Sequence, residues 1–279
     1  MTHQPNAEQI VRDTLHVMSQ GATAQQYVVD AYLAQRSRER DINWVVIQAA
    51  REYGATNMYA DRARLALGTG INVREADRFA VIMKEELDHY RAYMNLLDLT
   101  LGKGKEPPDS DSFHYLNVEF TANGAGFHGD SGAVVARKWP EHHRFITLWM
   151  KIYNELPKWT ARLLMTQGEG GSVGWHWCMS NLPGDDEFLR LAAKLEKTVV
   201  EDEIFHGPEE IKELAAGYDP ANALSWDETL NLAREMRYLD VRERNEQFLY
   251  PLGEAELEAI RRAIFEDTLA PSDIYAAVA

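Results

Sequence analysis

Apolar residues recur every three to four positions through most of this 279-residue chain, a spacing that predicts amphipathic α-helices. Turn-forming residues separate these segments, most clearly at Gly68–Asn72 and Asn181–Asp186. Gly21 is expected to divide the first segment into two helices, and Pro208 to break or kink the helix that precedes it. The expected helices span about residues 7–19, 24–38, 42–67, 73–100, 141–153, 156–180, 186–206, 209–216, 226–248 and 253–267.

Residues 101–135 interrupt the helical pattern because glycines and prolines crowd into them. A connection of this length in a compact domain is typical of a crossover or a functional loop. A short strand or hairpin is expected near residues 114–121. The sequence therefore predicts an all-α protein with a long crossover connection, folded as a single domain over residues 1–279.

Composition and charge narrow the classes of function. Hydrophobic residues make up 45% of the chain, enough for a sizeable core, and the net charge of −15 disfavours a nucleic-acid partner. The first residues lack the pattern of a signal peptide, and no apolar run is long enough to span a membrane. The single cysteine, Cys178, excludes an internal disulfide and a Cys-x-x-Cys site. These features predict a cytoplasmic protein.

Two Glu-x-x-His pairs, Glu86–His89 and Glu203–His206, are the first sign of metal chemistry. Residues three positions apart share one face of a helix, so each pair can offer a carboxylate and an imidazole to one ion. Either pair alone is weak evidence, because a chain this rich in glutamate produces such pairs by chance.

An equal interval strengthens this prediction. Glu52 precedes Glu86 by 34 residues, and Glu169 precedes Glu203 by the same 34. A turn cluster lies near the midpoint of each interval. A helix of about 16 residues rises about 24 Å to the turn, and the helix that follows the turn descends by the same length. Each pair of glutamates should therefore lie at the same height inside a four-helix bundle. The expected metal ligands are Glu52, Glu86, His89, Glu169, Glu203 and His206.

Charge balance favours the same interpretation. Four carboxylates in an interior need protons or cations, and two divalent metals would cancel their charge. Carboxylate and imidazole ligands without a thiolate suit iron or manganese. The opposing interpretation is a bundle of solvated glutamates and packed histidines. His176, two turns beyond Glu169, is expected to be a pocket or packing residue rather than a seventh ligand.

The ligand pattern resembles that of the ferritin-like di-iron carboxylate oxygenase superfamily. Within it, Glu169–Ser172 and Glu201–His206 are similar to the catalytic subunit of phenylacetyl-CoA epoxidase. The resemblance implies a ferritin-like four-helix bundle with additional N- and C-terminal helices. Its core would cover about residues 42–206, with helices at 42–67, 73–100, 156–180 and 186–206 and flanking helices within 7–38 and 209–267.

The resemblance also implies an activity. Two iron ions, or manganese in their place, would use dioxygen to hydroxylate or epoxidise a small organic substrate, with a CoA thioester as one candidate. The catalytic residues would be the four glutamates, Glu52, Glu86, Glu169 and Glu203. No cysteine cluster or nucleotide motif can deliver electrons, so a separate reductase is expected as a partner. The chain itself would form a homo- or hetero-oligomer. Gly170 and Gly171 are expected to leave space for oxygen or substrate.

Other functions stay open at this point. A ferritin-like iron-handling protein or ferroxidase would use the same ligands, although the long connection suits a minimal storage shell poorly. A non-catalytic partner subunit of an oxygenase would tend to lose ligands, whereas this chain keeps six. RNA hydroxylation by a related di-iron enzyme is disfavoured by the net charge of −15.

Overall fold

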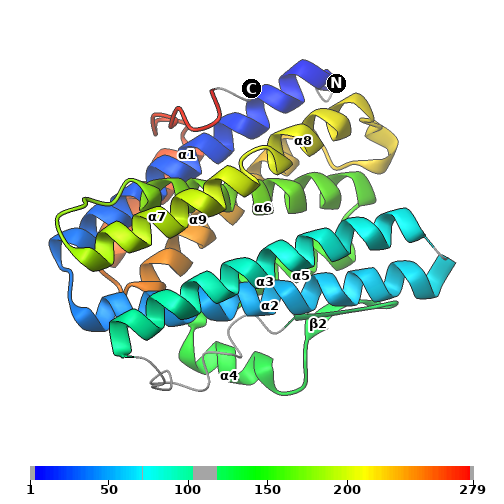
Figure 1. Cartoon of the computed structure of the whole chain (residues 1–279). Helices are drawn as coiled ribbons and strands as arrows, with labels where there is room; N and C mark the ends of the chain where they lie inside the picture. The colour runs from blue at the N-terminus through cyan, green and yellow to red at the C-terminus, as the bar shows by residue number, and fades with distance from the viewer. Residues whose placement is uncertain (1–3, 71, 103–117, 277–279) are drawn as a thin grey trace. The chain divides into compact units, whose positions relative to one another are not determined.

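The computed structural model describes residues 4–70, 72–102 and 118–276, which are mainly helical (Figure 1). This confirms the all-α class, with one small hairpin added. In chain order the elements are α1 (Ala7–Ala34), α2 (Arg38–Gly70), α3 (Val73–Leu101), β1 (Val118–Thr121), β2 (Gly124–Phe127), α4 (Ser131–Lys138), α5 (Pro140–Glu155), α6 (Lys158–Ser180), α7 (Glu187–Glu203), α8 (His206–Ala216), η2 (Pro220–Asn222), α9 (Trp226–Gln247) and α10 (Glu254–Phe265).

Contacts divide the chain into two compact units. Unit 1 contains Met1–Arg36 and Phe145–Ala279, and unit 2 contains Ser37–Arg144. The single domain predicted over the whole chain stays a prediction. No helix within the described ranges is both long enough and apolar enough to cross a bilayer.

In unit 2, α2 and α3 run side by side in opposite directions (Figure 1). Two pairs of aromatic rings fix their register: Tyr59 contacts Phe79, and Trp44 contacts Tyr93, each with ring centroids 6.2 Å apart. Along a pair of antiparallel helices, the residue number on one helix rises as the number of the residue opposite it falls. This register therefore places residue 52 of α2 opposite residue 86 of α3, as the equal interval predicts.

The connection after α3 contains more structure than the sequence suggests. β1 pairs with β2 in an antiparallel hairpin, in the register Val118↔Phe127, which confirms a hairpin near the expected place. The part of the expectation that falls on residues 114–117 lies outside the described residues. The helix α4 was not predicted; its Val135 packs with Ile47 and Ala50 of α2 in a small apolar cluster.

In unit 1, α1 packs against α6, α8 and α9, and α6 also packs against α7. The predicted break of α1 at Gly21 is wrong, because the helix is continuous from Ala7 to Ala34. A Cβ atom at position 21 would lie 2.7 Å from Cδ of Arg237. The glycine therefore makes room for a side chain of α9 instead of ending the helix.

The predicted helix over residues 186–206 is also corrected. α7 ends at Glu203, a turn occupies Ile204 and Phe205, and α8 begins at His206. Pro208 has no N–H to donate to the carbonyl four residues before it, that of Ile204, so the hydrogen-bond ladder is interrupted there. Glu203 and His206 consequently belong to two successive helices.

Helix α9 carries an unusual number of buried polar side chains. Arg237, Asp240 and Arg244 are each at most 1% exposed. Arg237 donates to Asp240 Oδ2 at 3.3 Å and to the carbonyl of Gly168 at 3.2 Å, and Gln25 donates to the same carboxylate oxygen at 2.6 Å. Nε of Arg244 lies 3.3 Å from Asp240 Oδ1. Asp240 thus compensates two buried guanidinium groups within unit 1.

Candidate metal centre

Unit 2 brings three of the predicted ligands together. Glu52 from α2 and Glu86 and His89 from α3 each offer one ligand atom, and these atoms all lie within 4.8 Å of one another. Glu52 and His89 are 7% and 5% exposed, and Glu86 is half-buried. Glu86 and His89 lie one turn apart on the same face of α3, and the α2–α3 register supplies Glu52 opposite them.

The distances within this cluster suit a shared cation. His89 Nδ1 lies 3.7 Å from Glu52 Oε2 and 3.9 Å from Glu86 Oε2. Both distances exceed those of a hydrogen bond. Donor atoms that each lie about 2.1 Å from one ion are separated by about 3–4 Å. The set of two carboxylates and one imidazole therefore fits a divalent metal such as iron or manganese.

Gln48, which the sequence reasoning missed, orients one of these carboxylates. It is 1% exposed and its Nε2 donates to Glu52 Oε1 at 3.0 Å. This hydrogen bond occupies one carboxylate oxygen and leaves Oε2 on the side of His89. Its position four residues before Glu52, on the same face of α2, is the signal that identifies it.

The electrostatics of the cluster indicate a site for positive charge. Burial lowers the pKa of His89, but the neighbouring carboxylates of Glu52 and Glu86 outweigh this effect and raise its pKa to about 11. Without a metal the imidazole is therefore protonated at neutral pH, and its charge partly balances the two acids. A bound divalent cation would take over this role and displace the proton from Nδ1.

The other three predicted ligands lie in unit 1. Glu169, on α6, is exposed, and Glu203, the last residue of α7, is half-buried. His206 begins α8, and its side chain lies outside the description. Among the side chains that the structure does describe, the gathered set is the one formed by Glu52, Glu86 and His89.

The register of α6 and α7 nevertheless places the unit 1 acids at one height. His176 Nδ1 lies 2.5 Å from Glu196 Oε2, and both side chains are buried. Glu169 is seven residues before His176, and Glu203 is seven residues after Glu196. Because α6 and α7 are antiparallel, moving two turns along each helix from this contact brings Glu169 and Glu203 to the same level.

The contact with Glu196 gives His176 a structural role in the packing of α6 against α7. It is 6% exposed and pairs with a carboxylate, in agreement with the expected packing histidine. Glu196, which is fully buried, was missed by the sequence reasoning. Its place seven residues before Glu203, on the same face of α7, is the available signal.

The opening expected at Gly170 and Gly171 is wrong. A Cβ atom at Gly170 would lie 2.9 Å from the Cα of Gly207, so the backbones of α6 and α8 touch there. A Cβ atom at Gly171 would collide with the guanidinium group of Arg237. Neighbouring groups fill the space beside these two glycines, which therefore leave no passage for oxygen or substrate.

Gly170→Ala is therefore expected to destabilise the protein by about 1–3 kcal/mol, because the neighbour it meets is backbone that cannot rotate away. Urea unfolding followed by circular dichroism measures this change. Gly184→Ala is the matched control, since a Cβ atom there meets nothing within 4 Å. Equal midpoints for both variants would contradict the close packing of α6 and α8.

Comparisons with known proteins give no match to a family model, a curated protein or a solved structure.

Proposed function

We propose that this protein is a di-iron oxygenase or oxidase that uses dioxygen to hydroxylate or epoxidise a small organic substrate. The observation that carries the proposal is the cluster of Glu52, Glu86 and His89. One iron ion would be held by this set. The second would be held by the set that repeats its spacing, Glu169, Glu203 and His206. In this proposal α2, α3, α6 and α7 are the four helices of a ferritin-like bundle.

The bound metals would supply the oxygen-binding and redox chemistry that no side chain of the chain provides. The protein's own residues supply the geometry. Gln48 fixes the orientation of the Glu52 carboxylate, and the burial of Glu52 and His89 keeps bulk water from competing for the ion. His89 must give up its proton so that Nδ1 can bind.

Electrons must come from outside the chain. The sequence contains one cysteine and no credible nucleotide-binding motif, so a separate reductase is the proposed donor. A CoA thioester is the proposed class of substrate on the strength of the resemblance alone. Assembly of the chain into a homo- or hetero-oligomer belongs to the same proposal.

A single-turnover experiment tests this function. Protein loaded anaerobically with iron(II) should consume about one dioxygen for each pair of ferrous ions and then stop until a reductant is added. Continued consumption without added electrons would contradict the need for a reductase. Uptake of many iron ions per chain, with formation of a ferric mineral in a large hollow oligomer, would instead indicate iron storage.

Metal binding should depend on pH because the metal competes with the proton on His89. The pKa of this imidazole is raised from 6.5 to about 11, so it is protonated across the neutral range. Between pH 6.5 and 9 the affinity for manganese(II) should rise by about tenfold per pH unit, with about one proton released per ion at this site. Titration calorimetry in buffers of different ionisation enthalpy measures both quantities. An affinity that does not change over this range would contradict the raised pKa of His89.

A further inference from the structure

The two proposed sets of metal ligands are held unequally by the fold. The unit 2 set is Glu52, Glu86 and His89, and the unit 1 set is Glu169, Glu203 and His206. Both sets contain two carboxylates and one imidazole, so a difference in their affinity for a metal must come from how the surrounding structure holds these ligands. Three structural differences favour the unit 2 set.

The first difference is the backbone that carries each Glu-x-x-His pair. Glu86 and His89 lie within α3, which is one continuous helix, so their spacing on one face is fixed. Glu203 is the last residue of α7, and His206 is the first residue of α8 after a turn at residues 204–205. A pair divided between two helices is less constrained, and fixing it when a metal binds lowers the affinity.

The second difference is the residue four positions before the first glutamate of each set, on the same face of its helix. In α2 this residue is Gln48, whose Nε2 donates to Glu52 Oε1 at 3.0 Å. In α6 it is Met165, whose thioether has no hydrogen to donate to Glu169. A hydrogen bond that orients a ligand carboxylate contributes about 10–100-fold to the affinity for the metal.

The third difference is the exposure of the first glutamate to water. Glu52 is 7% exposed, whereas Glu169, at the corresponding position of α6, is an exposed residue. A carboxylate that the fold has already withdrawn from water gains more from a nearby cation than a solvated carboxylate does, because the local dielectric is lower. All three differences therefore act in the same direction.

We propose that the unit 2 set is the high-affinity site of the two and binds its ion first. The unit 1 set then binds the second ion at least about tenfold more weakly. When iron is limiting, the protein carries its ion in unit 2. This inference rests on the proposed two-metal function and adds an order of loading to it, since chemistry that needs both ions begins only when the unit 1 set is filled.

Titration of the metal-free protein with manganese(II) tests the order of loading. Electron paramagnetic resonance of the free ion counts the manganese that stays in solution, so it separates a tight binding step from a weaker one. Glu86→Ala should remove the tight step, and Glu203→Ala should remove the weak step. Two steps of equal affinity would overturn the proposal, and so would loss of the tight step in Glu203→Ala.

Gln48→Leu isolates the effect of the hydrogen bond to Glu52. It should weaken the tight step by about 10–100-fold and leave the weak step within about twofold, whereas a general loss of folding would weaken both steps. Met165→Leu is the matched control at the corresponding position of α6, and this swap of similar volume should change either step by less than about twofold. An unchanged tight step in Gln48→Leu would overturn the role of this glutamine in the order of loading.

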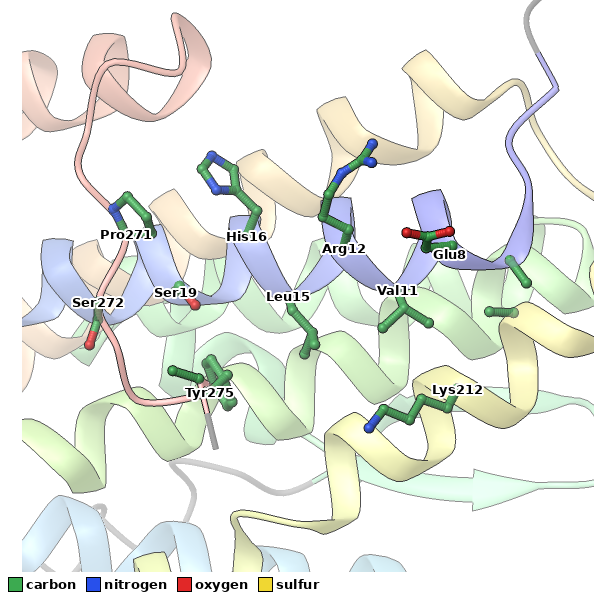
Figure 2. A pocket seen from close by; sticks show the side chains of 13 residues that line it. Glu8, Val11, Arg12, Leu15, His16, Ser19, Lys212, Pro271, Ser272 and Tyr275 are labelled. Atoms are coloured by element: carbon green, nitrogen blue, oxygen red, sulfur yellow. The ribbon is translucent and has the colours of Figure 1, made fainter. Parts of the chain in front are cut away.

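An exposed pair of imidazole and carboxylate provides the control for adventitious metal binding. His16 lies on α1 beside a pocket of about 590 Å³ in unit 1 (Figure 2), and its Nε2 is 2.7 Å from the carboxylate of Asp267. The side chains of this pair are 37% and 53% exposed. His16→Ala should leave both steps unchanged, and loss of the tight step in this variant would overturn the proposal.

The same titrations separate failure of this inference from failure of the proposed function. Binding of one ion only, lost in Glu86→Ala, would support unit 2 as the high-affinity site and contradict a function that needs two ions. Binding of two ions with equal affinity would leave the two-metal function standing and overturn the order of loading.

Discussion

Glu86→Ala is expected to remove metal from the protein. The substitution deletes one of two carboxylates in a site with a single imidazole, and ligand loss should weaken binding by roughly a hundredfold or more. Wild-type protein reconstituted with iron(II) and then desalted should retain about two metal ions per chain, and Glu86→Ala at most about one. Metal analysis by mass spectrometry measures this content. Glu203→Ala tests the second set in the same way.

Asp88→Ala is the matched control for this loss. Asp88 lies on the same helix between Glu86 and His89, but it is exposed and pairs with Lys84 and Arg91 on the outside of α3. Its removal leaves the ligand atoms unchanged, so its metal content should equal that of the wild type. If folded Glu86→Ala kept full metal content, the proposed centre in unit 2 would be abandoned.

Among the proposed substitutions, Asp240→Ala should cause the largest decrease in the free energy of unfolding. The side chains of Arg237 and Arg244 are fully buried, and Asp240 is the carboxylate within 3.3 Å of both. Its removal would take a carboxylate away from both buried guanidinium groups, and breaking a buried ion pair in this way costs about 3–5 kcal/mol. The free energy of unfolding in urea, followed by circular dichroism, measures this cost.

Glu201→Ala provides the comparison for an exposed ion pair. Glu201 lies 3.9 Å from Lys197 on the outside of α7, and both side chains are about two-thirds exposed. Water already screens such a pair, so its loss should change the unfolding midpoint little. Replacing Arg237 with methionine in the Asp240→Leu background should recover part of the stability, because one of the two buried guanidinium groups that faced Asp240 is removed with it. An Asp240→Ala variant as stable as Glu201→Ala would contradict the role of this carboxylate.

The helices and one half of the candidate centre could be predicted from the sequence because both depend on local regularities. Helical periodicity located α2 and α3, and the constant rise of a helix placed Glu52 level with Glu86 across the turn. The Glu86–His89 pair required nothing beyond the geometry of one helical turn. The same reasoning placed Glu169 level with Glu203, which the register of α6 and α7 supports.

The two failures at Gly21 and Gly171 share one physical cause, which is that the effect of each glycine depended on a side chain distant in sequence. Gly21 looked like a helix break, yet in the fold it admits Arg237, 216 positions away along the chain. Gly171 looked like an open passage, yet the same guanidinium fills it. Propensity disfavours a glycine within a helix by only about 1 kcal/mol, so packing against α9 decides the outcome.

The sequence by itself therefore determined the helical class, the level of paired glutamates and the ligand types that a divalent metal would meet. Tertiary structure alone decided that His176 of α6 pairs with Glu196 of α7 and that Arg237 of α9 fills the space beside Gly21 and Gly171. Spacing along one helix is fixed by backbone geometry. Contacts between helices depend on which side chains meet after the chain has packed, and no local pattern encodes that choice.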